Sequence, residues 1–441
     1  MKNIYLSIIL VCLVGHLFSY SLYENYELGI GKRISHLDAR SAGMGGTGTA
    51  GGYNIFDNML NPANTGFLND GWGAQVLLDV TQLEENRSMP MYNFFDSYVD
   101  DATYASNTNF FTDIAFAVSY KIKFDNLSLA AALDYKPFAN FNACYEEQVR
   151  NNEGSDHDNY PPIIAMNYLE SDGDIYSIGI TTAMTYHRDE LWFSNSAIGL
   201  NLNLLSGDHK LERKIIWSEF AKDVAVLDDL EQIRTDRDLS ALSFSLGLKT
   251  DISERVSAGL MFNPGFTMEV DSSLTEENED FDYPSIIRLG VQYRPRNALR
   301  TTFHCDVEFV QWSDISDFYD NVTNYYFGVE HIFPHAPALR LGFNYVTSPN
   351  LSVKEDGSSI PGPVNIPTIT AGTGFRVYGN FFLDLSGEFS HRKYETMDLF
   401  PDGFYDHQGL WSGTYRPEDR LDPDTVREYY IRLKSSLTFR W

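Results

Sequence analysis

The chain has 441 residues, a formal net charge of −28 at pH 7 and an aromatic content of 14%. A charge this negative argues against nucleic acid as a partner, because nucleic-acid-binding surfaces are basic. The three cysteines are too few for a disulfide framework, and the sequence contains no Gly-x-Ser-x-Gly motif. We therefore expect neither an enzyme nor a bound cofactor.

The first 21 residues have the pattern of a secretory signal peptide. Lys2 is followed by an apolar run from Ile4 to Phe18 and then by the small-x-small sequence Ser19-Tyr20-Ser21. We expect cleavage before Leu22. A membrane-anchoring helix is the alternative, but this apolar run of 15 residues is short for a membrane span.

A glycine-rich stretch lies between Asp38 and Leu68. It contains six glycines within ten residues and then the tripeptide Asn61-Pro62-Ala63. Glycine at this density permits tight turns and close backbone packing, whereas the sequence lacks the periodic apolar residues of an independent core. Gly43-x-Gly45-x-x-Gly48 matches a dinucleotide fingerprint, but no buried strand precedes it and no helix follows it in the pattern. We expect residues 22–70 to form an irregular segment that depends on contacts with the surrounding chain, because it has no core of its own.

From Trp72 onward the sequence alternates between apolar and polar residues, which is the period of a β-strand. The last strand is the clearest, since its apolar residues share one face: Tyr429, Ile431, Leu433, Leu437, Phe439 and Trp441. The pattern predicts 14 such strands up to Trp441. An even number of alternating strands predicts an all-β, antiparallel transmembrane barrel over residues 71–441, with apolar side chains toward lipid and polar ones toward the lumen.

The predicted connections alternate in length. Short turns are expected at 124–126, 187–189, 252–254, 294–297, 334–336 and 378–380, and one strand is expected to begin at Trp192. Longer polar loops are expected at roughly 87–112, 142–173, 209–238, 273–283, 314–323, 349–367 and 396–426. This asymmetry is typical of outer-membrane barrels. We expect a monomer in outer-membrane lipid with both termini periplasmic, so that residues 22–70 enter the lumen from the periplasmic side.

Several charged residues are predicted to be buried in the lumen: Arg288, Arg340, Arg376, Asp306, Glu308, Asp384 and Glu388. Two interpretations stay open. The arginines bind the carboxylate of a ligand, or the charges pair with one another and with the N-terminal segment, because burying an unpaired charge is costly. The acidic loops around His157 and 276–282 would bind Ca²⁺ or remain solvated. Solvation is the simpler interpretation, so no metal site is expected.

Several short runs resemble, in their order and spacing, the FadL family of outer-membrane transporters for hydrophobic compounds. They are Ala39–Gly46, Asn61–Ala63, Pro284–Pro295, Asp306–Ser313, Leu339–Tyr345, Pro361 and Gly372–Phe375. The resemblance covers most of the mature chain. It implies a 14-stranded barrel plugged by an N-terminal hatch that includes Asn61, Pro62 and Ala63. It also implies passive uptake of a hydrophobic or amphipathic ligand, such as a long-chain fatty acid.

The same family releases substrate sideways through a bend in its third strand. Pro137 and Asn140, near the outer end of the predicted third strand, would supply such a bend, because proline removes a ladder donor. Alternatively, Pro137 simply ends the strand. A sister group similar to PorV uses the fold in protein secretion and surface attachment, and the N-terminal run fits that group nearly as well. Transport is the first functional hypothesis, and a secretion-associated role is the alternative.

Overall fold

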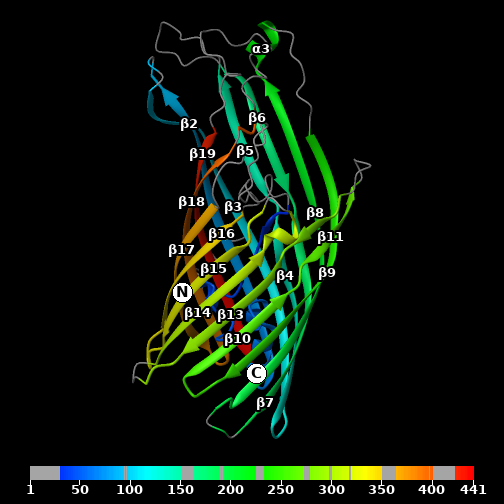
Figure 1. Cartoon of the computed structure of the whole chain (residues 1–441), viewed down its shortest axis with the longest axis vertical. Helices are drawn as coiled ribbons and strands as arrows, with labels where there is room; N and C mark the ends of the chain where they lie inside the picture. Colours follow the sequence, from blue (N-terminus) through cyan, green and yellow to red (C-terminus); the bar gives the residue numbers. More distant parts are fainter. Residues whose placement is uncertain are drawn as a thin grey trace.

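The alternating sequence folds into a wall of antiparallel strands that closes on itself (Figure 1). This computed structural model describes residues 30–441 except 94, 96, 151–162, 189, 191, 225–232, 273–278, 297–299, 317–318, 350–363, 397 and 401–422. The signal-peptide prediction for residues 1–21 therefore lies outside the described residues, as do His157 and part of the acidic loop at 276–282.

The wall contains 14 strands that pair in one closed circuit, so the predicted barrel is confirmed. They are β2 (Gly71–Tyr92), β3 (Tyr98–Lys123), β4 (Leu127–Asn140), β7 (Asp174–His187), β8 (Asn195–Trp217), β9 (Ile233–Asp251), β10 (Val256–Asn263), β13 (Ser285–Tyr293), β14 (Thr301–Gln311), β15 (Val322–His331), β16 (Ala338–Ser348), β17 (Val364–Tyr378), β18 (Phe381–Thr396) and β19 (Asp424–Arg440). Each strand pairs with the next along this list, and β19 pairs with β2.

One side of the wall rises higher than the other (Figure 1). β5 (Ala143–Arg150) continues β4, and β6 (Ile163–Asp172) leads into β7. Likewise β11 (Phe266–Ser272) continues β10, and β12 (Phe281–Tyr283) leads into β13. The short helices α3 (Glu219–Val224) and η4 (Trp312–Asp314) follow β8 and β14. None of the helices in the described part of the chain is long and apolar enough to cross a membrane.

The outer surface of the wall is apolar and its inner surface is polar. Large apolar side chains are exposed on the outside of strands throughout the circuit, among them Ile178, Ile198, Leu246, Leu289, Leu341 and Leu433. The residues that alternate with them are buried and polar, for example Thr181, Asn201, Ser245 and Arg340. Because successive side chains of a strand point to opposite faces, this alternation is what a barrel surrounded by lipid requires.

Two predictions about the connections are wrong. Trp192 does not begin a strand. It lies in the connection between β7 and β8, and β8 starts at Asn195. The loops predicted at 87–112, 142–173 and 209–238 are largely strand, because β2, β3, β5, β6, β8 and β9 extend into them. Polar residues are frequent on both faces of the ends of β2, β3, β8 and β9, whereas β5 and β6 bury apolar residues such as Tyr145 and Leu169. The alternation that predicts a lipid-facing strand is therefore lost in these parts of the chain.

Residues 30–70, the N-terminal segment, lie inside the wall (Figure 1). They form only β1 (Lys32–Arg33), α2 (Ala39–Ala42), η2 (Ile55–Met59) and η3 (Pro62–Phe67), and β2 begins at Gly71. Their side chains reach opposite sides of the circuit: Asn58 donates to Asp134 on β4, and Arg40 donates to Glu330 on β15. Hydrogen bonds to the wall thus stabilise a segment that has little regular secondary structure of its own.

Glycines allow the backbone of the N-terminal segment to touch the backbone of the wall. Gly45 adopts φ of 71°, a conformation that favours glycine. It lies against Gly342 of β16, where an added Cβ would collide with the backbone of Met44 and Gly45. At this contact the Gly45 N–H donates to Thr370 Oγ1 (2.9 Å), and Asn344 Nδ2 donates to the Gly45 carbonyl (3.1 Å).

We predict that Gly342→Ala weakens docking of the N-terminal segment, because the new methyl group meets main-chain atoms that cannot rotate away. Overpacking of this kind costs about 1–3 kcal/mol. Residues 38–68 of the folded barrel should become more sensitive to protease. Gly387→Ala on β18 is the matched control, since its added Cβ would lie 3.5 Å from Leu433, an ordinary contact. Equal sensitivity in the two variants would contradict the prediction.

Candidate functional site

A chain of ion pairs joins the N-terminal segment to β15, β16 and β18. Arg40 donates from Nε (2.8 Å) and Nη2 (2.5 Å) to the carboxylate of Glu330. Arg340 Nε donates to the same carboxylate (2.8 Å), and its Nη1 lies 2.7 Å from Asp384. Burial alone would lower the pKa of Arg40, but Glu330 raises it above its ordinary value. Arg340 is thus already paired with two carboxylates of the protein, Glu330 and Asp384.

Arg288 has a comparable position on β13. Its Nη2 donates to the carbonyl of Gly46 (2.5 Å) and lies 3.2 Å from Asp306, while its Nη1 lies 3.5 Å from Glu308. Asp306 also accepts from the N–H (3.0 Å) and the hydroxyl (2.8 Å) of Thr49. For Arg288, as for Arg340, the geometry favours pairing within the protein over ligand binding.

Arg376 requires a correction. It was predicted to be buried in the lumen, but it is exposed near the turn between β17 and β18. Its guanidinium donates to the Gly379 carbonyl and to Asn380 Oδ1 (3.5 Å). Arg376 pairs with Phe382 close to the end of the strand, so its side chain lies at the mouth of the barrel and not in the buried part of the lumen.

Asn61, Pro62 and Ala63 form the start of η3, which packs on β7, β8 and β9. Asn61 is fully buried; its Nδ2 donates to the carbonyls of Thr49 (2.8 Å) and Leu248 (2.9 Å). Its Oδ1 accepts from the Ala63 N–H (3.0 Å), and Pro62 occupies the first turn, where no N–H is needed. One side chain thus caps the helix and joins two parts of the segment to β9.

A cavity of about 190 Å³ lies above the N-terminal segment, toward the rim opposite the short turns. Its lining contains both polar and apolar residues. The polar residues include Lys32, Arg33, His36, Glu308, Glu388 and Arg432, and the apolar ones include Ile30, Tyr283, Ile286, Val310, Trp312 and Ile366. Such a cavity fits an amphipathic molecule better than an ion or a fully polar solute.

Arg33 is one of the charged residues that line this cavity. No side-chain hydrogen bond or ion pair of Arg33 is found among the described residues, and burial lowers its pKa although Glu308 opposes the shift. The neighbouring Lys32 ammonium, by contrast, lies 4.2 Å from the ring centroid of Tyr430. An anionic group in the cavity would offset the cost of burying the Arg33 charge.

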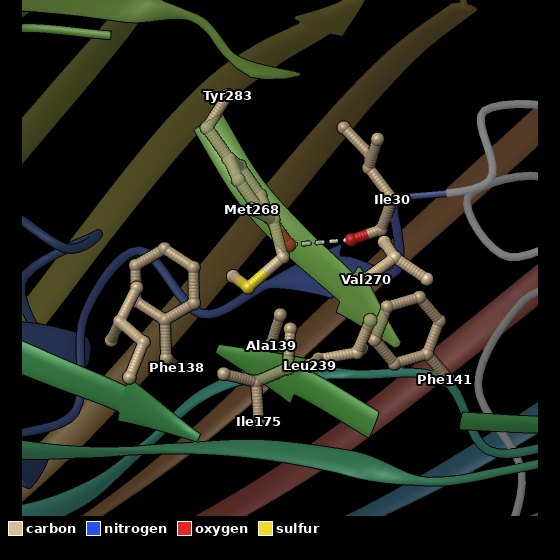
Figure 2. Close-up of a cluster of buried hydrophobic side chains, with 10 residues drawn as sticks. Ile30, Phe138, Ala139, Phe141, Ile175, Leu239, Met268, Val270 and Tyr283 are labelled. Atoms are coloured by element: carbon tan, nitrogen blue, oxygen red, sulfur yellow. Dashed lines mark hydrogen bonds between the residues drawn. The ribbon is translucent and has the colours of Figure 1, made fainter. Parts of the chain in front are cut away.

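The apolar lining of the cavity overlaps with a buried cluster, the inner aromatic cluster, shown in Figure 2. Its members are Ile30, Phe138, Ala139, Phe141, Ile175, Leu205, Leu239, Met268, Val270 and Tyr283. Ile30 and Tyr283 also line the cavity. Phe138 lies edge-on to Tyr283 at 5.2 Å between ring centroids, so the cluster connects the cavity to β4.

β4 leaves its neighbour β3 at this point. Pairing of the two strands ends at Tyr135 opposite Phe116, although β4 runs on through Pro137 to Asn140. Its pairing with β7 shifts register between Pro137 and Ala139. Pro137 therefore does not end the strand. Beyond it, β1 replaces β3 as the partner of β4.

Above this break, β3 and the continuation of β4 are joined through side chains. Asn107 on β3 donates from Nδ2 to the Glu146 carbonyl of β5 (3.3 Å) and accepts from the Glu146 N–H at 3.1 Å. Asn109 Nδ2 donates to the Cys144 carbonyl at 3.2 Å. The wall is thus held together above and below the break, and β3 and β4 lack backbone pairing between the two levels.

Comparison with known proteins gives a match in fold alone. No protein-family model and no curated protein sequence matches the chain. Among solved structures, it resembles a Pseudomonas aeruginosa FadL homologue at a TM-score of 0.54 and 11% identity, covering 92% of this chain and 99% of that one. The FadL resemblance is therefore confirmed as a similarity of structure.

Two further structures of the same shape are described as toluene transporters. TodX of Pseudomonas putida matches at a TM-score of 0.55 and 12% identity, over 93% of this chain and 99% of that one. TbuX of Ralstonia pickettii matches at a TM-score of 0.51 and 14% identity, over 92% and 99%. At these identities the likeness establishes the barrel and carries over no individual residue.

Asp57 in η2 is a buried carboxyl group whose environment favours the protonated form. Its Oδ2 accepts from the N–H groups of Tyr53 (2.8 Å) and Asn54 (2.9 Å), but its Oδ1 is buried without a hydrogen-bond partner. Burial, followed by the nearby charge of Asp38, raises the pKa of Asp57 to about 7, against the opposing charge of Arg40.

We predict that the N-terminal segment docks more weakly as pH rises. A raised folded-state pKa contributes stability below the unfolded value, 3.8, that is lost as pH rises through about 7. Hydrogen exchange of residues 52–60, corrected for intrinsic rates, should therefore increase between pH 4 and 8, by up to about tenfold per unit. In Asp57→Asn this dependence should be much weaker. The same pH dependence in both proteins would show that Asp57 does not titrate in this range.

Proposed function

We propose that this chain is an outer-membrane channel for passive uptake of hydrophobic small molecules, with residues 22–70 as its plug. The apolar exterior supports insertion in a membrane. The predicted signal peptide at 1–21 and the position of the C-terminus beside the short turns (Figure 1) support an outer membrane with both termini periplasmic. Structures of similar fold are described as transporters of toluene.

The observation that carries this proposal is the amphipathic cavity and its continuation into the inner aromatic cluster. Lumens of membrane barrels are generally polar, and most inward residues here are polar as well. The apolar side chains between the cavity and β4 are therefore an exception that a hydrophobic ligand explains. A ligand entering at the rim would move from the cavity along this cluster toward β4.

The ligand class that fits this cavity is an amphipathic acid, such as a long-chain fatty acid. The apolar lining residues suit a hydrocarbon chain, and the Arg33 guanidinium makes no ion pair with the residues that the structure describes. Charge-assisted hydrogen bonds between a guanidinium and a carboxylate are among the strong ones. Arg288 and Arg340, which were predicted as candidates to bind the ligand carboxylate, are already paired within the protein. Arg33 is therefore the residue that we propose for this role.

The exit of the ligand is proposed at the break between β3 and β4. Pro137 lies just past Tyr135, the last residue of β4 that pairs with β3. Asn140, at the end of the strand, donates to Asp174, which also accepts from Asn142 at 3.1 Å. These amides hold the bent end of β4 against β7. A ligand leaving here would enter the lipid directly and would not have to displace the whole plug.

A secretion-associated role is the second candidate, and one feature favours it. The hairpin of β2 and β3 ends above the apolar exterior, with Met91, Tyr92, Phe95, Tyr98 and Val99 exposed. Exposed apolar groups of this kind mark surfaces that bind other proteins. Deletion of the gene separates the two candidates. Loss of surface-protein export with normal uptake of hydrophobic compounds would reject the transport proposal.

We predict that Arg33→Ala lowers uptake of a radiolabelled long-chain fatty acid roughly tenfold, the effect of losing one charge-assisted hydrogen bond. Uptake of uncharged toluene by the same cells should stay near the wild-type rate. Arg188→Ala, in the connection after β7, controls for removal of a positive charge elsewhere. If Arg33→Ala carries the acid as fast as the wild type, the carboxylate assignment fails.

A further prediction concerns the plug. Asn61→Ala leaves the buried carbonyls of Thr49 and Leu248 without their donor, which costs about 1–3 kcal/mol. Conductance in planar bilayers should rise in this variant, and it should rise further when residues 22–70 are deleted. A deletion variant that is as closed as the full chain would contradict the assignment of this segment as the plug.

A further inference from the structure

A second cavity lies on the outside of the wall, over β13, β14, β15 and β16. It has a volume of about 510 Å³ and is called the outer hollow below. Its lining includes apolar side chains that are exposed on the outer face of these strands: Val291, Tyr293, Phe303, Phe327, Leu341 and Phe343. In the proposed membrane placement the outer hollow therefore opens toward lipid and not toward the lumen.

The outer hollow exists because small residues lie among large ones. Cys305 is the smallest outward side chain of the lining, and it lies opposite Val291 on one side and Phe327 on the other. Gly328 and Gly342, which also line the hollow, have no side chain. Apolar atoms that border an empty space lose the dispersion contacts that a neighbour would give. A hydrocarbon chain seated in the hollow would restore these contacts.

Two exposed arginines lie in the turn at one edge of the outer hollow. At this edge Tyr293 of β13 lies opposite Phe303 of β14. The chain that connects them carries Arg296 and Arg300, and both are exposed. Neither arginine makes an ion pair or a side-chain hydrogen bond with the residues that the structure describes. The apolar hollow is thus next to two positive charges that are open to a partner from outside.

Aromatic rings at the same end of the wall indicate where the lipid headgroups lie. Trp72 contacts Tyr120 (4.8 Å between ring centroids) and Phe439 contacts Trp441 (4.9 Å), all close to the short turns. Tyr293 is the last residue of β13. In membrane barrels such aromatic residues form a girdle at the interface between hydrocarbon and water. The turn that follows Tyr293 therefore lies at the level of the headgroups.

We propose that the outer hollow and the two arginines bind one anionic phospholipid, from the leaflet on the side of the short turns. One acyl chain occupies the hollow, and the phosphate contacts Arg296 and Arg300, because guanidinium groups bind phosphate oxygens in a bidentate geometry. The chain as a whole has a charge of −28, so the attraction for an anion is local. The site goes beyond the proposed transport function and shares with it only the placement in a membrane.

Native mass spectrometry of the full-length barrel tests this site, after reconstitution in nanodiscs of phosphatidylglycerol and phosphatidylcholine in equal amounts. The wild type should retain phosphatidylglycerol at least about tenfold more than phosphatidylcholine, since each basic residue near anionic lipid contributes roughly fivefold. In the double variant Arg296→Gln/Arg300→Gln the two lipids should be retained about equally. Cys305→Phe fills the hollow and should lower retention of both lipids at least about fourfold, the effect of withdrawing one CH₂ group from an apolar site.

Two variants are matched controls. Arg188→Gln removes a positive charge from the turn after β7, and Ala131→Phe adds the same ring to the outer face of β4. Both should retain phosphatidylglycerol as the wild type does. Heat-dependent migration on a gel checks that each variant forms the barrel, and Cys305→Leu replaces Cys305→Phe if that variant does not.

The outcomes separate this site from the proposed function. Equal retention of the two lipids by the wild type overturns the phosphate assignment. Undiminished retention in the filled variant overturns the hollow as the site of the acyl chain. An equal loss in Arg188→Gln overturns local recognition, because any charge at that end would then suffice. A protein that does not enter nanodiscs at all contradicts the membrane placement itself, and with it both proposals.

Discussion

The pairing of buried charges between the N-terminal segment and the wall is the interaction on which the rest of this structure depends. A closed barrel of alternating strands encloses polar side chains, and an unpaired charge in that interior is costly. The Glu330 carboxylate pairs both with Arg40 of the segment and with Arg340 of the wall. The Asp306 carboxylate accepts a hydrogen bond from Thr49 of the segment and pairs with Arg288 of the wall. The irregular segment is thereby held without a core of its own.

The pairing of buried charges also helps to identify the candidate site, because the cavity contains a charge for which no such pair is found among the described residues. Lumen arginines such as Arg288 and Arg340 have carboxylate partners, whereas no ion pair of Arg33 is found among the described residues. The inner aromatic cluster shares Ile30 and Tyr283 with the lining of the same cavity and is apolar, unlike most of the lumen. In the proposed channel, an amphipathic ligand would contact both Arg33 and this apolar lining.

The sequence predicts most of the wall and little of the site, for physical reasons. Alternation marks a strand wherever one face meets lipid, so strands such as β19 and the closed 14-strand count follow from the pattern. Above the part of the wall with an apolar exterior this pattern is lost: β5 and β6 bury apolar residues such as Tyr145 and Leu169, and these strands were predicted as loop. The burial of Arg376 was inferred from alternation alone, which indicates the face of a side chain and not its depth, and Arg376 is exposed near a turn. Arg33 carries no local signal, since most of the residues that line its cavity are more than a hundred positions away in the sequence.

The break between β3 and β4 shows why the N-terminal segment and the wall have to be considered together. In an ordinary sheet, a strand that leaves its neighbour exposes backbone groups, and within a membrane these have no water to bind. Here β1 occupies the edge of β4 at Ala139 and Asn140, and Asn107 joins β3 to β5 higher up. The edge of β4 that β3 leaves at this level is therefore satisfied by a part of the N-terminal segment. In the proposed channel, any displacement of β1 would also remove this partner of β4, so that passage of a ligand at this level would be coupled to the position of the N-terminal segment.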